Sequence, residues 1–464
     1  MSAQPRVIYL GGFGRSGSTL LERILGQIPG WTNVGELVDL PRSVFVHQEN
    51  CGCGEPFLSC PMWSKVGEAA FGGWHEDEMK RLADLRFAVA RQRQLGGLIA
   101  LARGRGSDQL RADVQAYQAG YGAIYRAVAE VTGAQVIVDA SKGPAHGLAL
   151  ALTAGVDPGY DMSMVNLVRD PRGVAYSWSR RQTSRPQASG EAGAEMWRIS
   201  AERSALQWAA LQSEMSLMAR AAGVEMVRMR YEDLVERPLP SLRRLLDQLQ
   251  LPDADLSHIT DDVVRLDASH GLSGNPGRFT SGEITLSGDH AWRTALPARD
   301  RYFVTAATLP ALLAEGGDVH IVDFFYTRCL TVCRTLGGSF QQLQAALQAD
   351  AAAGQPSGVR LVSISVDGAH DDPAALTAYA GGLHAQPALW QFVRVPDAAQ
   401  QQALLRRLGV VVVPDGRGDF EHNAALLVFD RHGRMVRVFD LAEQQLALNY
   451  ARHLARQPAP EGLS

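Results

Sequence analysis

The sequence predicts an α/β protein with a mostly parallel first sheet, followed by a second, smaller α/β domain. In the first half of the chain, short aliphatic runs alternate with longer stretches of helical period, in the order strand, helix, strand. Near residue 316 a new cycle of buried-strand and helix patterns begins. We therefore expect two domains, residues 1–315 and residues 316–464.

Length and charge agree with this organisation and exclude several classes of protein. The chain has 464 residues, 46% of them hydrophobic, which is enough for more than one core. Its formal net charge of −4 offers no general attraction for nucleic acid or an anionic membrane. No uncharged apolar stretch approaches the roughly 20 residues of a membrane-spanning helix, and the first residues lack a secretory pattern. We expect a cytoplasmic protein without a membrane span and without a nucleic-acid partner.

The elements of the first domain follow from hydrophobic period. An arginine-rich stretch, residues 79–131, is expected to be helical, with its arginines on solvated faces; a basic wall over an anionic substrate is the alternative. The remaining strands and helices are expected at residues 7–10, 19–25, 136–138, 146–152 and 164–168.

The second domain shows the order strand, helix, strand, helix, then a hairpin and a last helix. Residues 424–429 and 435–439 bracket the turn sequence Asp-Arg-His-Gly and predict the hairpin. This order is typical of a thioredoxin-like domain. The other elements are expected at residues 320–326, at a helix ending near 348, and at 359–366, 373–381, 398–408 and 443–455.

A glycine-rich loop follows the first strand. Residues 11–19 read Gly-Gly-Phe-Gly-Arg-Ser-Gly-Ser-Thr, and an apolar helix follows, whose first N–H groups favour an anion. Gly12 and Gly17 have the spacing of a nucleotide-triphosphate loop, but Ser18 stands where that motif has lysine, which argues against an ATPase. Because Arg15 supplies a positive charge inside the loop, we predict a phosphate or sulfate site.

This loop resembles that of the sulfotransferase family, which uses 3′-phosphoadenosine 5′-phosphosulfate (PAPS) as sulfuryl donor. The family loop reads Pro-Lys/Arg-Ser-Gly-Thr/Ser-Thr, and this chain departs from it at one position, where glycine replaces proline. The resemblance implies the sulfotransferase fold, a P-loop-like parallel sheet with flanking helices. It also implies that the arginine neutralises charge on the bridging oxygen as its bond breaks. The implied donor-binding residues here are Gly14, Arg15, Ser16, Gly17, Ser18 and Thr19.

Two later segments carry the same resemblance. The predicted strand at residues 164–168 ends in Arg169, and Ser177 follows on the next helix. In the family these two positions bind the 3′-phosphate, through a guanidinium fork and a hydroxyl. Residues 273–282 resemble the family segment that closes over the adenosine diphosphate end, which implies nucleotide contacts for Arg278 and Gly282. A surface loop rich in glycine and proline is the alternative for this segment.

Two further residues are implied to take part in the transfer. Residues 31–37 read as a short strand ending in Gly-Glu, and in the tyrosylprotein-type branch of the family a glutamate in this context accepts the acceptor proton. Glu36 is therefore the expected base; a surface carboxylate or a salt bridge to Arg42 is the alternative. The same branch carries a lysine after the next strand that stabilises the leaving oxygen, which here is Lys142. The hallmark residues 231–234 are expected to be structural.

Three cysteines lie close together at Cys51, Cys53 and Cys60, and resemble a cluster in bacterial sulfotransferases of this type. A zinc site needs a fourth ligand, for which His47 is the nearest candidate, and Cys-x-Cys differs from the usual zinc knuckle. We therefore favour a structural thiol or disulfide loop over zinc.

The second domain has a cysteine pair of its own. Cys329 and Cys333 are one helical turn apart after a buried strand, at a helix N-terminus that favours thiolate. Two soft thiolates and one imidazole suit copper, preferably Cu(I), and we expect the imidazole on a distant strand, where the sequence offers His422.

This set of three residues resembles the Sco/SenC family of thioredoxin-like copper-handling proteins, over roughly residues 316–455. The resemblance implies that the three residues bind copper, although Leu330 and Arg334 replace family prolines and Glu421 replaces aspartate. The opening hairpin of the family is missing, so the domain is expected to be truncated at its N-terminal side. Copper binding, thiol redox chemistry and a degenerate packing module all remain open.

Together these features predict a PAPS-dependent sulfotransferase fused to a Sco-like domain. The expected acceptor is a hydroxyl or an amine on a small molecule, carbohydrate, lipid or peptide, and a copper or redox partner protein is expected for the second domain. The competing hypothesis is a Sco-like copper-binding or thiol-redox protein whose first half is a nucleotide-binding regulator.

Overall fold

The computed structural model divides the chain into two compact units. The first takes in Met1–Ser200 and Ala210–His290, and the second Ala201–Ala209 and Ala291–Gly462. For residues 332–335, 399–400, 414 and 421 only the backbone is described. The structure describes residues 4–152, 155, 157–180, 198–297, 299–301, 303–305, 307–308, 318–329, 332–353, 357–368, 370–395, 398–414, 420–423, 425–431 and 433–457.

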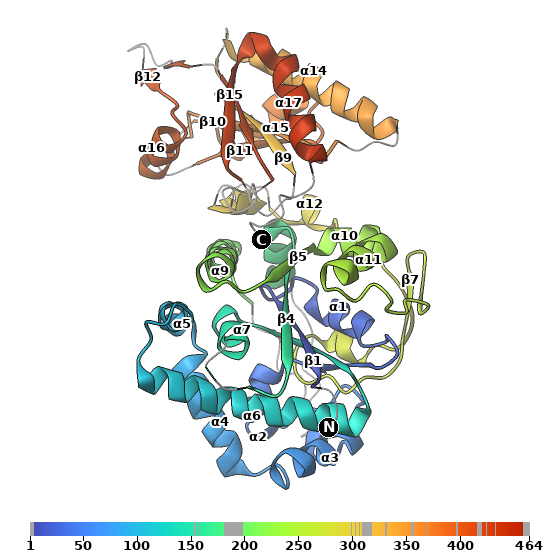
Figure 1. Ribbon diagram of the computed structural model, residues 1–464. Helices are drawn as coiled ribbons and strands as arrows, with labels where there is room; N and C mark the ends of the chain where they lie inside the picture. The colour runs from blue at the N-terminus through green and yellow to red at the C-terminus, as the bar shows by residue number, and fades with distance from the viewer. Residues whose placement is uncertain are drawn as a thin grey trace. The chain divides into compact units, whose positions relative to one another are not determined.

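The first unit is built on a five-stranded sheet in the order β2-β3-β1-β4-β5 (Figure 1). All of its neighbouring strands are parallel, which confirms the predicted class. The central strand lies between β3 and β4 with nearly every residue buried, as a strand covered on both faces requires. The strands are β1 (Arg6–Gly11), β2 (Trp31–Gly35), β3 (Val136–Lys142), β4 (Asp161–Val168) and β5 (Met226–Arg230).

Helices cover both faces of this sheet (Figure 1). Because side chains alternate along a strand, Val7 and Tyr9 of β1 enter one core while Ile8 and Leu10 enter the other. The core that contains Ile8 and Leu10 also contains α1 (Ser18–Leu25), α10 (Tyr231–Glu236) and α11 (Pro238–Gln248). The core that contains Val7 and Tyr9 also contains α2 (Leu40–Phe45), α3 (Pro61–Phe71), α4 (Glu76–Val89), α5 (Leu95–Ala102), α6 (Asp108–Thr132), α7 (Pro144–Ala151) and the later part of α9 (Ala201–Ala222).

The segments that complete the first unit follow β4 and α11. Helix α8 (Pro171–Ser179) starts directly after β4, with Asp170 as its N-cap. A small antiparallel sheet contains β6 (Ile259–Thr260), β7 (Val263–Leu266) and β8 (Gly282–Thr285). Between β7 and β8 the chain returns to the main sheet, where Leu272 forms a parallel bridge with Gly35.

The second unit has a mixed five-stranded sheet in the order β11-β10-β9-β14-β15. Strands β9, β10 and β11 are parallel, and β14 runs antiparallel to both β9 and β15. The predicted hairpin is present as β14 and β15. The strands of this sheet are β9 (Val319–Phe325), β10 (Val359–Ser365), β11 (Trp390–Arg394), β14 (Ala425–Phe429) and β15 (Met435–Asp440). A separate antiparallel pair consists of β12 (Val412–Pro414) and β13 (Phe420–His422).

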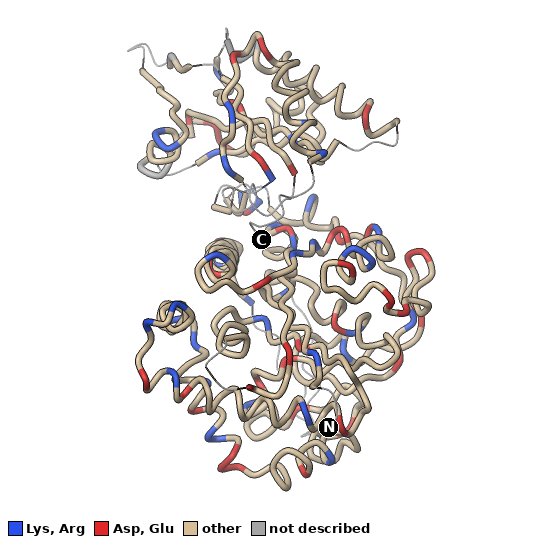
Figure 2. Tube along the Cα trace, viewed as in Figure 1, with Lys and Arg blue, Asp and Glu red and all other residues tan. Residues whose placement is uncertain are grey.

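The second sheet has a core of its own, and this arrangement agrees with the thioredoxin-like prediction. Side chains of β9, β10 and β14 pack with α17 in one hydrophobic cluster. Within the described ranges, no helix is both long and apolar enough to cross a membrane. Charges of both signs are interspersed along the two units (Figure 2). The helices are α12 (Trp292–Ala295), α14 (Val332–Ala352), α15 (Pro373–Gly382), α16 (Ala398–Arg407) and α17 (Gln444–Arg456).

A buried carboxyl, Asp323, sits in the middle of the second sheet. Its neighbour across the β9–β10 pairing is Ser363, and its Oδ1 atom has no hydrogen-bond partner among the described residues. Burial raises the pKa of Asp323 to about 7, against a usual value of 3.8.

We predict that stability of the second unit depends on this carboxyl. Between about pH 4 and pH 7 the folded state holds a proton that the unfolded chain has released, so the free energy of unfolding falls as pH rises, by about 1.4 kcal/mol per unit of pKa difference. Asp323→Asn should flatten this dependence and stabilise the unit at pH 8. Hydrogen exchange of β9 and β10 amides between pH 5 and pH 8, corrected for intrinsic exchange, measures the free energy of unfolding of both proteins. The same pH dependence in Asp323→Asn and the wild type would contradict the prediction.

Candidate functional site

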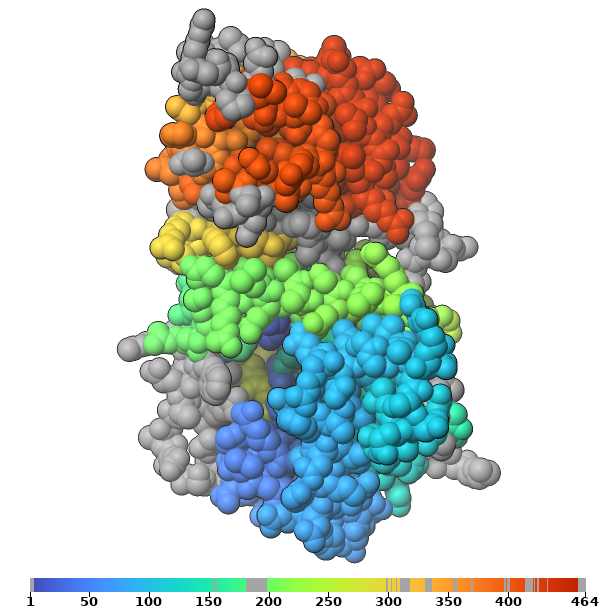
Figure 3. Space-filling view, turned by 90° about the vertical axis from the view of Figure 1, so that its left-hand side faces the viewer, coloured from blue at the N-terminus to red at the C-terminus, as the bar shows by residue number. Residues whose placement is uncertain are grey.

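A cavity of about 470 Å³ lies at the carboxyl edge of the first sheet, within the usual range for small-molecule sites. The loops that follow β1, β2, β3 and β4 all reach it, because the carboxyl ends of parallel strands share one edge. The space-filling view shows a hollow in the first unit, with dark-blue N-terminal atoms and yellow-toned atoms near residue 270 inside it (Figure 3). The polar and charged lining residues are Arg15, Ser18, Thr19, Arg23, Glu36, Asp39, Lys142, Arg169, Ser177, Tyr231, Ser273, Asn275 and Thr280.

The glycine-rich loop forms one wall of the cavity. Arg15 and Gly17 have positive φ angles of 72° and 92°, and Gly17 is the N-cap of α1. A Cβ atom at Gly17 would lie 2.4 Å from Tyr231 Cδ2, so this position needs glycine for space as well as for conformation. Of the six predicted loop residues, Gly14, Arg15, Gly17, Ser18 and Thr19 line the cavity.

The sixth predicted loop residue, Ser16, is buried behind the cavity wall. Its hydroxyl has no hydrogen-bond partner in the described part of the chain. A buried hydroxyl without a partner is unfavourable unless something else supplies one. A buried water behind the loop would satisfy this group.

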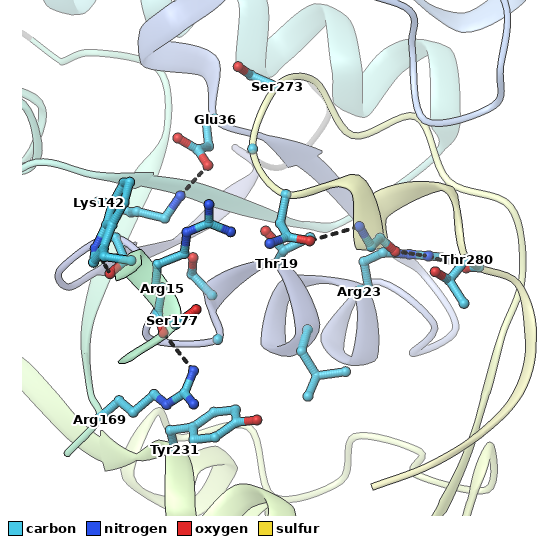
Figure 4. Close-up of a pocket in the computed structure, with 18 of the residues that line it drawn as sticks. Arg15, Thr19, Arg23, Glu36, Lys142, Arg169, Ser177, Tyr231, Ser273 and Thr280 are labelled. Carbon is cyan, nitrogen blue, oxygen red and sulfur yellow. Dashed lines mark hydrogen bonds and ion pairs between the residues drawn. The ribbon is translucent and has the colours of Figure 1, made fainter. Parts of the chain in front are cut away.

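A second group of predicted residues lies beside the loop. Arg169 and Ser177 both line the cavity. The Arg169 guanidinium donates to the backbone oxygen of Arg15 at 2.9 Å and to Asp289 Oδ2 at 2.7 Å. It also lies 4.5 Å from the centre of the Tyr231 ring. These contacts hold the guanidinium beside the loop, with the Tyr231 ring next to it (Figure 4).

Glu36 and Lys142 form an ion pair at the other end of the cavity (Figure 4). Each follows or ends a strand, and both side chains are largely buried. Glu36 comes directly after Gly35, whose φ is 78° and whose Cβ position would collide with backbone atoms of Leu272. The expected alternative, a salt bridge from Glu36 to Arg42, is absent from the described contacts, in which Arg42 bonds to His47. A carboxylate and an ammonium therefore face the same cavity as the loop.

A buried polar network supports this ion pair from behind. Asp139 accepts hydrogen bonds from Tyr125 Oη at 2.6 Å and from the Ser141 backbone N–H at 2.9 Å. Burial raises the pKa of Asp139 to about 6, against these hydrogen bonds, which lower it. The Ser141 hydroxyl in turn accepts from the Val38 N–H at 3.0 Å. The network thus joins the end of β3 to the segment that begins with Glu36.

Two predicted nucleotide contacts lie outside the cavity lining. Gly282 is exposed at the start of β8. Arg278 is 2% exposed, forms an ion pair with Glu49 at 3.5 Å, and donates to the backbone oxygen of Ser273 at 2.9 Å. In this structure Arg278 holds the segment that carries Ser273 and Asn275, which do line the cavity.

Sequence reasoning missed several side chains of the site, among them Arg23, Trp178 and Tyr231. Arg23 follows Thr19 by one helical turn on α1 and donates to the backbone oxygens of residues 267, 277 and 280. The helical spacing from Thr19 is the signal that could have found it. Trp178 lies 4.9 Å from the Arg15 guanidinium, and Tyr231 stacks on Arg169. Tyr231 belongs to the segment that was expected to be structural only.

The three N-terminal cysteines gather around a histidine, but not the one nearest in sequence. His47 bonds to Arg42 Nε at 2.8 Å. His270 Nδ1 instead lies 3.5 Å from Cys51 Sγ and 3.2 Å from Cys60 Sγ. All three thiols are free in this structure.

The predicted copper ligands of the second unit are partly described. Cys329 is buried just after β9, and its N–H donates to the backbone oxygen of Tyr326. His422 lies on β13, as expected, with its ring 6.2 Å from the Tyr326 ring. Burial lowers the pKa of His422, which favours the neutral imidazole that a metal requires. Cys333 lies in the first turn of α14, and its side chain is outside the described residues.

Comparison with known proteins agrees with both halves of the sequence prediction. Residues 5–255 match the model of the sulfotransferase family, and residues 315–456 match the SCO1/SenC model. The SCO1 protein homologue of Bacillus subtilis (strain 168) is 25% identical over 129 residues, which are 27% of this chain and 64% of that protein. The chain thus spans less than two thirds of that relative's length.

Solved structures with similarity to the second unit include two Sco proteins. A SCO1/SenC family lipoprotein from Bacillus anthracis str. Ames has 21% identity and a TM-score of 0.28, covering 30% of this chain and 83% of its own. Bradyrhizobium japonicum ScoI with copper bound has 25% identity and a TM-score of 0.25, covering 30% of this chain and 85% of its own. The predicted combination of a sulfotransferase part and a Sco-like part is confirmed by the family matches.

Proposed function

The chain belongs to the sulfotransferase family over residues 5–255, and from this premise we propose that it transfers a sulfuryl group from PAPS to a hydroxyl or amine acceptor. The observation that carries the proposal is the cavity that gathers the loop at residues 14–19, the pair Arg169 and Ser177, and the pair Glu36 and Lys142. These groups can hold an anion at two points and place a base beside it.

The 5′-phosphosulfate of the donor is assigned to the glycine-rich loop. Backbone N–H groups at the start of α1 and the Arg15 guanidinium supply positive charge there. Thr19 and Ser18 add hydroxyl donors from the first turn of the helix.

The 3′-phosphate is assigned to Arg169 and Ser177. A guanidinium offers a phosphate two parallel donors, and a hydroxyl adds a third. Asp289 now accepts from one of these donors, at 2.7 Å. In this proposal the phosphate takes the place of Asp289, because it carries more negative charge and meets both donors.

Transfer requires a base that takes the proton from the acceptor, and positive charge that stabilises the leaving oxygen. The acceptor oxygen or nitrogen attacks the sulfur, and Glu36 takes the proton of that hydroxyl or amine. The bond between sulfur and the bridging oxygen breaks, and its electron pair stays on the phosphate of 3′,5′-adenosine bisphosphate. Lys142 and Arg15 stabilise that oxygen by charge and hydrogen bonding. No metal is needed for this balance of atoms and charge.

We assign the reaction to the cytoplasm. The described thiols Cys51, Cys53 and Cys60 form no disulfide, which suits a reducing compartment. The acceptor belongs to the class of small molecules, carbohydrates, lipids or peptides that carry a hydroxyl or an amine.

A second activity, copper binding, is proposed for residues 316–464. The supporting observations are that Cys329 lies in the turn after β9, where its N–H bonds to the Tyr326 oxygen, and that the His422 ring lies 6.2 Å from the Tyr326 ring. Two thiolates and one neutral imidazole form a donor set that suits Cu(I). Cys329, Cys333 and His422 would hold the ion, and a copper or redox partner protein would supply or receive it.

Donor binding tests the first proposal. Calorimetry with 3′,5′-adenosine bisphosphate should give micromolar binding to the wild type. Arg15→Ala and Arg169→Ala should each weaken it by about 30- to 150-fold, because each removes a charged phosphate partner worth about 2–3 kcal/mol. Arg81→Ala, which removes an exposed arginine paired with Glu78, is the matched control and should bind like the wild type. Absence of binding to folded wild-type protein would refute the proposal.

Glu36→Gln separates binding from chemistry. The variant should keep its affinity for the product nucleotide but lose about 100- to 10,000-fold in sulfuryl transfer, since the amide cannot accept the proton. Transfer is measured with radiolabelled PAPS against a panel of phenol, sugar and peptide acceptors. Glu68→Gln, at an exposed carboxylate on α3, is the control. Equal turnover in Glu36→Gln and the wild type would rule out Glu36 as the base.

Copper binding tests the second proposal. The wild type should bind one Cu(I) per chain more than Cys329→Ser or His422→Ala, measured by competition with a chromophoric Cu(I) chelator. His453→Ala, at a histidine bonded to Gln457 on α17, should behave like the wild type. The same stoichiometry in all four proteins would disprove the assignment.

A further inference from the structure

A cluster of sulfur and nitrogen donors lies outside the cavity in the first unit. Cys51, Cys53, Cys60 and His270 each offer one ligand atom, and the four atoms all lie within 4.8 Å of one another. The contacts are 3.8 Å between the sulfurs of Cys53 and Cys60, and 3.5 Å and 3.2 Å from His270 Nδ1 to Cys51 and Cys60. Among the described residues this is the group of donors that could hold a metal ion.

These separations are close to those of a tetrahedral zinc site. With Zn–S bonds of about 2.3 Å and Zn–N bonds of about 2.0 Å, tetrahedral geometry puts two sulfurs about 3.8 Å apart and a sulfur and a nitrogen about 3.5 Å apart. A disulfide instead needs sulfurs about 2.05 Å apart. The donor set of three cysteines and one histidine is also one of the usual sets for structural zinc.

The backbone around the cysteines is shaped to turn the thiols inward. Gly54 has a φ of 94°, and its N–H donates to the backbone oxygen of Cys51 at 2.8 Å. Gly52 lies against residues 269–271, where a Cβ atom would meet the Ser269 oxygen at 2.7 Å. Cys60 is the N-cap of α3. A tight turn at residues 51–54 therefore lets Cys51 and Cys53 point toward the same site despite their short spacing. The absence of a side chain at Gly52 lets this turn pack against the backbone beside His270.

Other contacts bring His270 to the cysteines. The Trp63 indole donates to the backbone oxygen of His270 at 2.8 Å, and the Gly52 N–H donates to the oxygen of Gly271 at 3.0 Å. The Arg278 guanidinium donates to the oxygen of Asn50, the residue before Cys51, at 3.3 Å. Three thiolates and one divalent cation have a net charge of −1. The Arg278 guanidinium lies near this site and would partly compensate that charge.

We propose that Cys51, Cys53, Cys60 and His270 bind one Zn²⁺ ion in a closed, structural site. All four positions are filled by protein, so the ion has no open position for a substrate. The site does not depend on the proposed transfer reaction, because its donors lie outside the cavity lining.

The ion would fix the position of the segment after His270, which forms part of the cavity wall. Two residues after His270, Leu272 accepts from the Glu36 N–H at 2.8 Å and donates to the Val34 oxygen at 3.0 Å. Ser273 and Asn275, which follow, line the cavity. Zinc would thus tie the loop at residues 51–60 to the segment that fixes the backbone of Glu36. This positioning role rests on the proposed function; the metal site itself does not.

Metal content of the full chain tests the site directly. The background is Cys329→Ser with Cys333→Ser, which removes the cysteines of the second unit from the measurement. Purified without added metal or chelator, this protein should contain about one zinc per chain by elemental analysis, as closed sites bind tightly. His270→Ala should lower the content at least tenfold, and His47→Ala, the histidine nearest in sequence but bonded to Arg42, should leave it unchanged.

A second measurement keeps the test independent of how the variants fold. Replacement of zinc by Co²⁺ in the background protein should give the intense thiolate-to-cobalt absorption of a site rich in cysteine. Folded protein without zinc that also takes up neither Zn²⁺ nor Co²⁺ would overturn the proposal. So would a disulfide between Cys53 and Cys60 found by mass spectrometry of freshly purified protein, or unchanged zinc in folded His270→Ala.

The positioning role has its own readout. Removal of zinc by a chelator should lower the turnover of the transfer reaction more than the affinity for 3′,5′-adenosine bisphosphate, since Leu272 contacts the backbone at Glu36 rather than the glycine-rich loop. Equal loss of binding and turnover would refute the positioning role. Failure to detect any transfer in the zinc-loaded protein would count against the proposed function and leave the metal content as the test of the site.

Discussion

Parallel pairing of β2, β3, β1 and β4 is the constraint on which the site depends. Each of these strands ends at the same edge, so residues far apart in the sequence meet there without long loops. The ion pair between Glu36 and Lys142 joins positions 106 residues apart. The bond from Arg169 to the oxygen of Arg15 spans 154 residues. A change of strand order would separate these partners even if every local motif were kept.

Two cations of the cavity are paired with carboxylates before any ligand arrives. Arg169 is held by Asp289, and Lys142 by Glu36. The Arg23 guanidinium donates to backbone oxygens of residues 267 and 277. An anion that binds Arg169 or Lys142 therefore has to exchange partners with a carboxylate, which limits affinity at these two positions.

Local patterns in the sequence were sufficient to predict most strands of both sheets, the glycine-rich loop and the candidate residues Glu36, Lys142, Arg169 and Ser177, because strand, loop and helix signals lie within a few residues of each other. They did not predict the edge strands β5 and β11. They were insufficient for Arg278 and for the fourth donor beside the cysteines. Arg278 is a buried ion-pair partner of Glu49, and His270 reaches Cys51 across 219 residues. Contacts of this kind are set by the return of the chain from β7 to β2, which no spacing motif records. The domain boundary at residue 315 and the roles of the site residues stay predictions.

The separate cores of the two units bear on how this chain folds. One hydrophobic cluster contains only residues from Val319 to Ala455 and the positions packed against it, and the two clusters around the first sheet contain none of these. Each unit can therefore collapse around its own core, so a single melting temperature does not describe the molecule. During synthesis the first sheet has all of its strands before β9 leaves the ribosome, which keeps its edges from pairing with strands of the second.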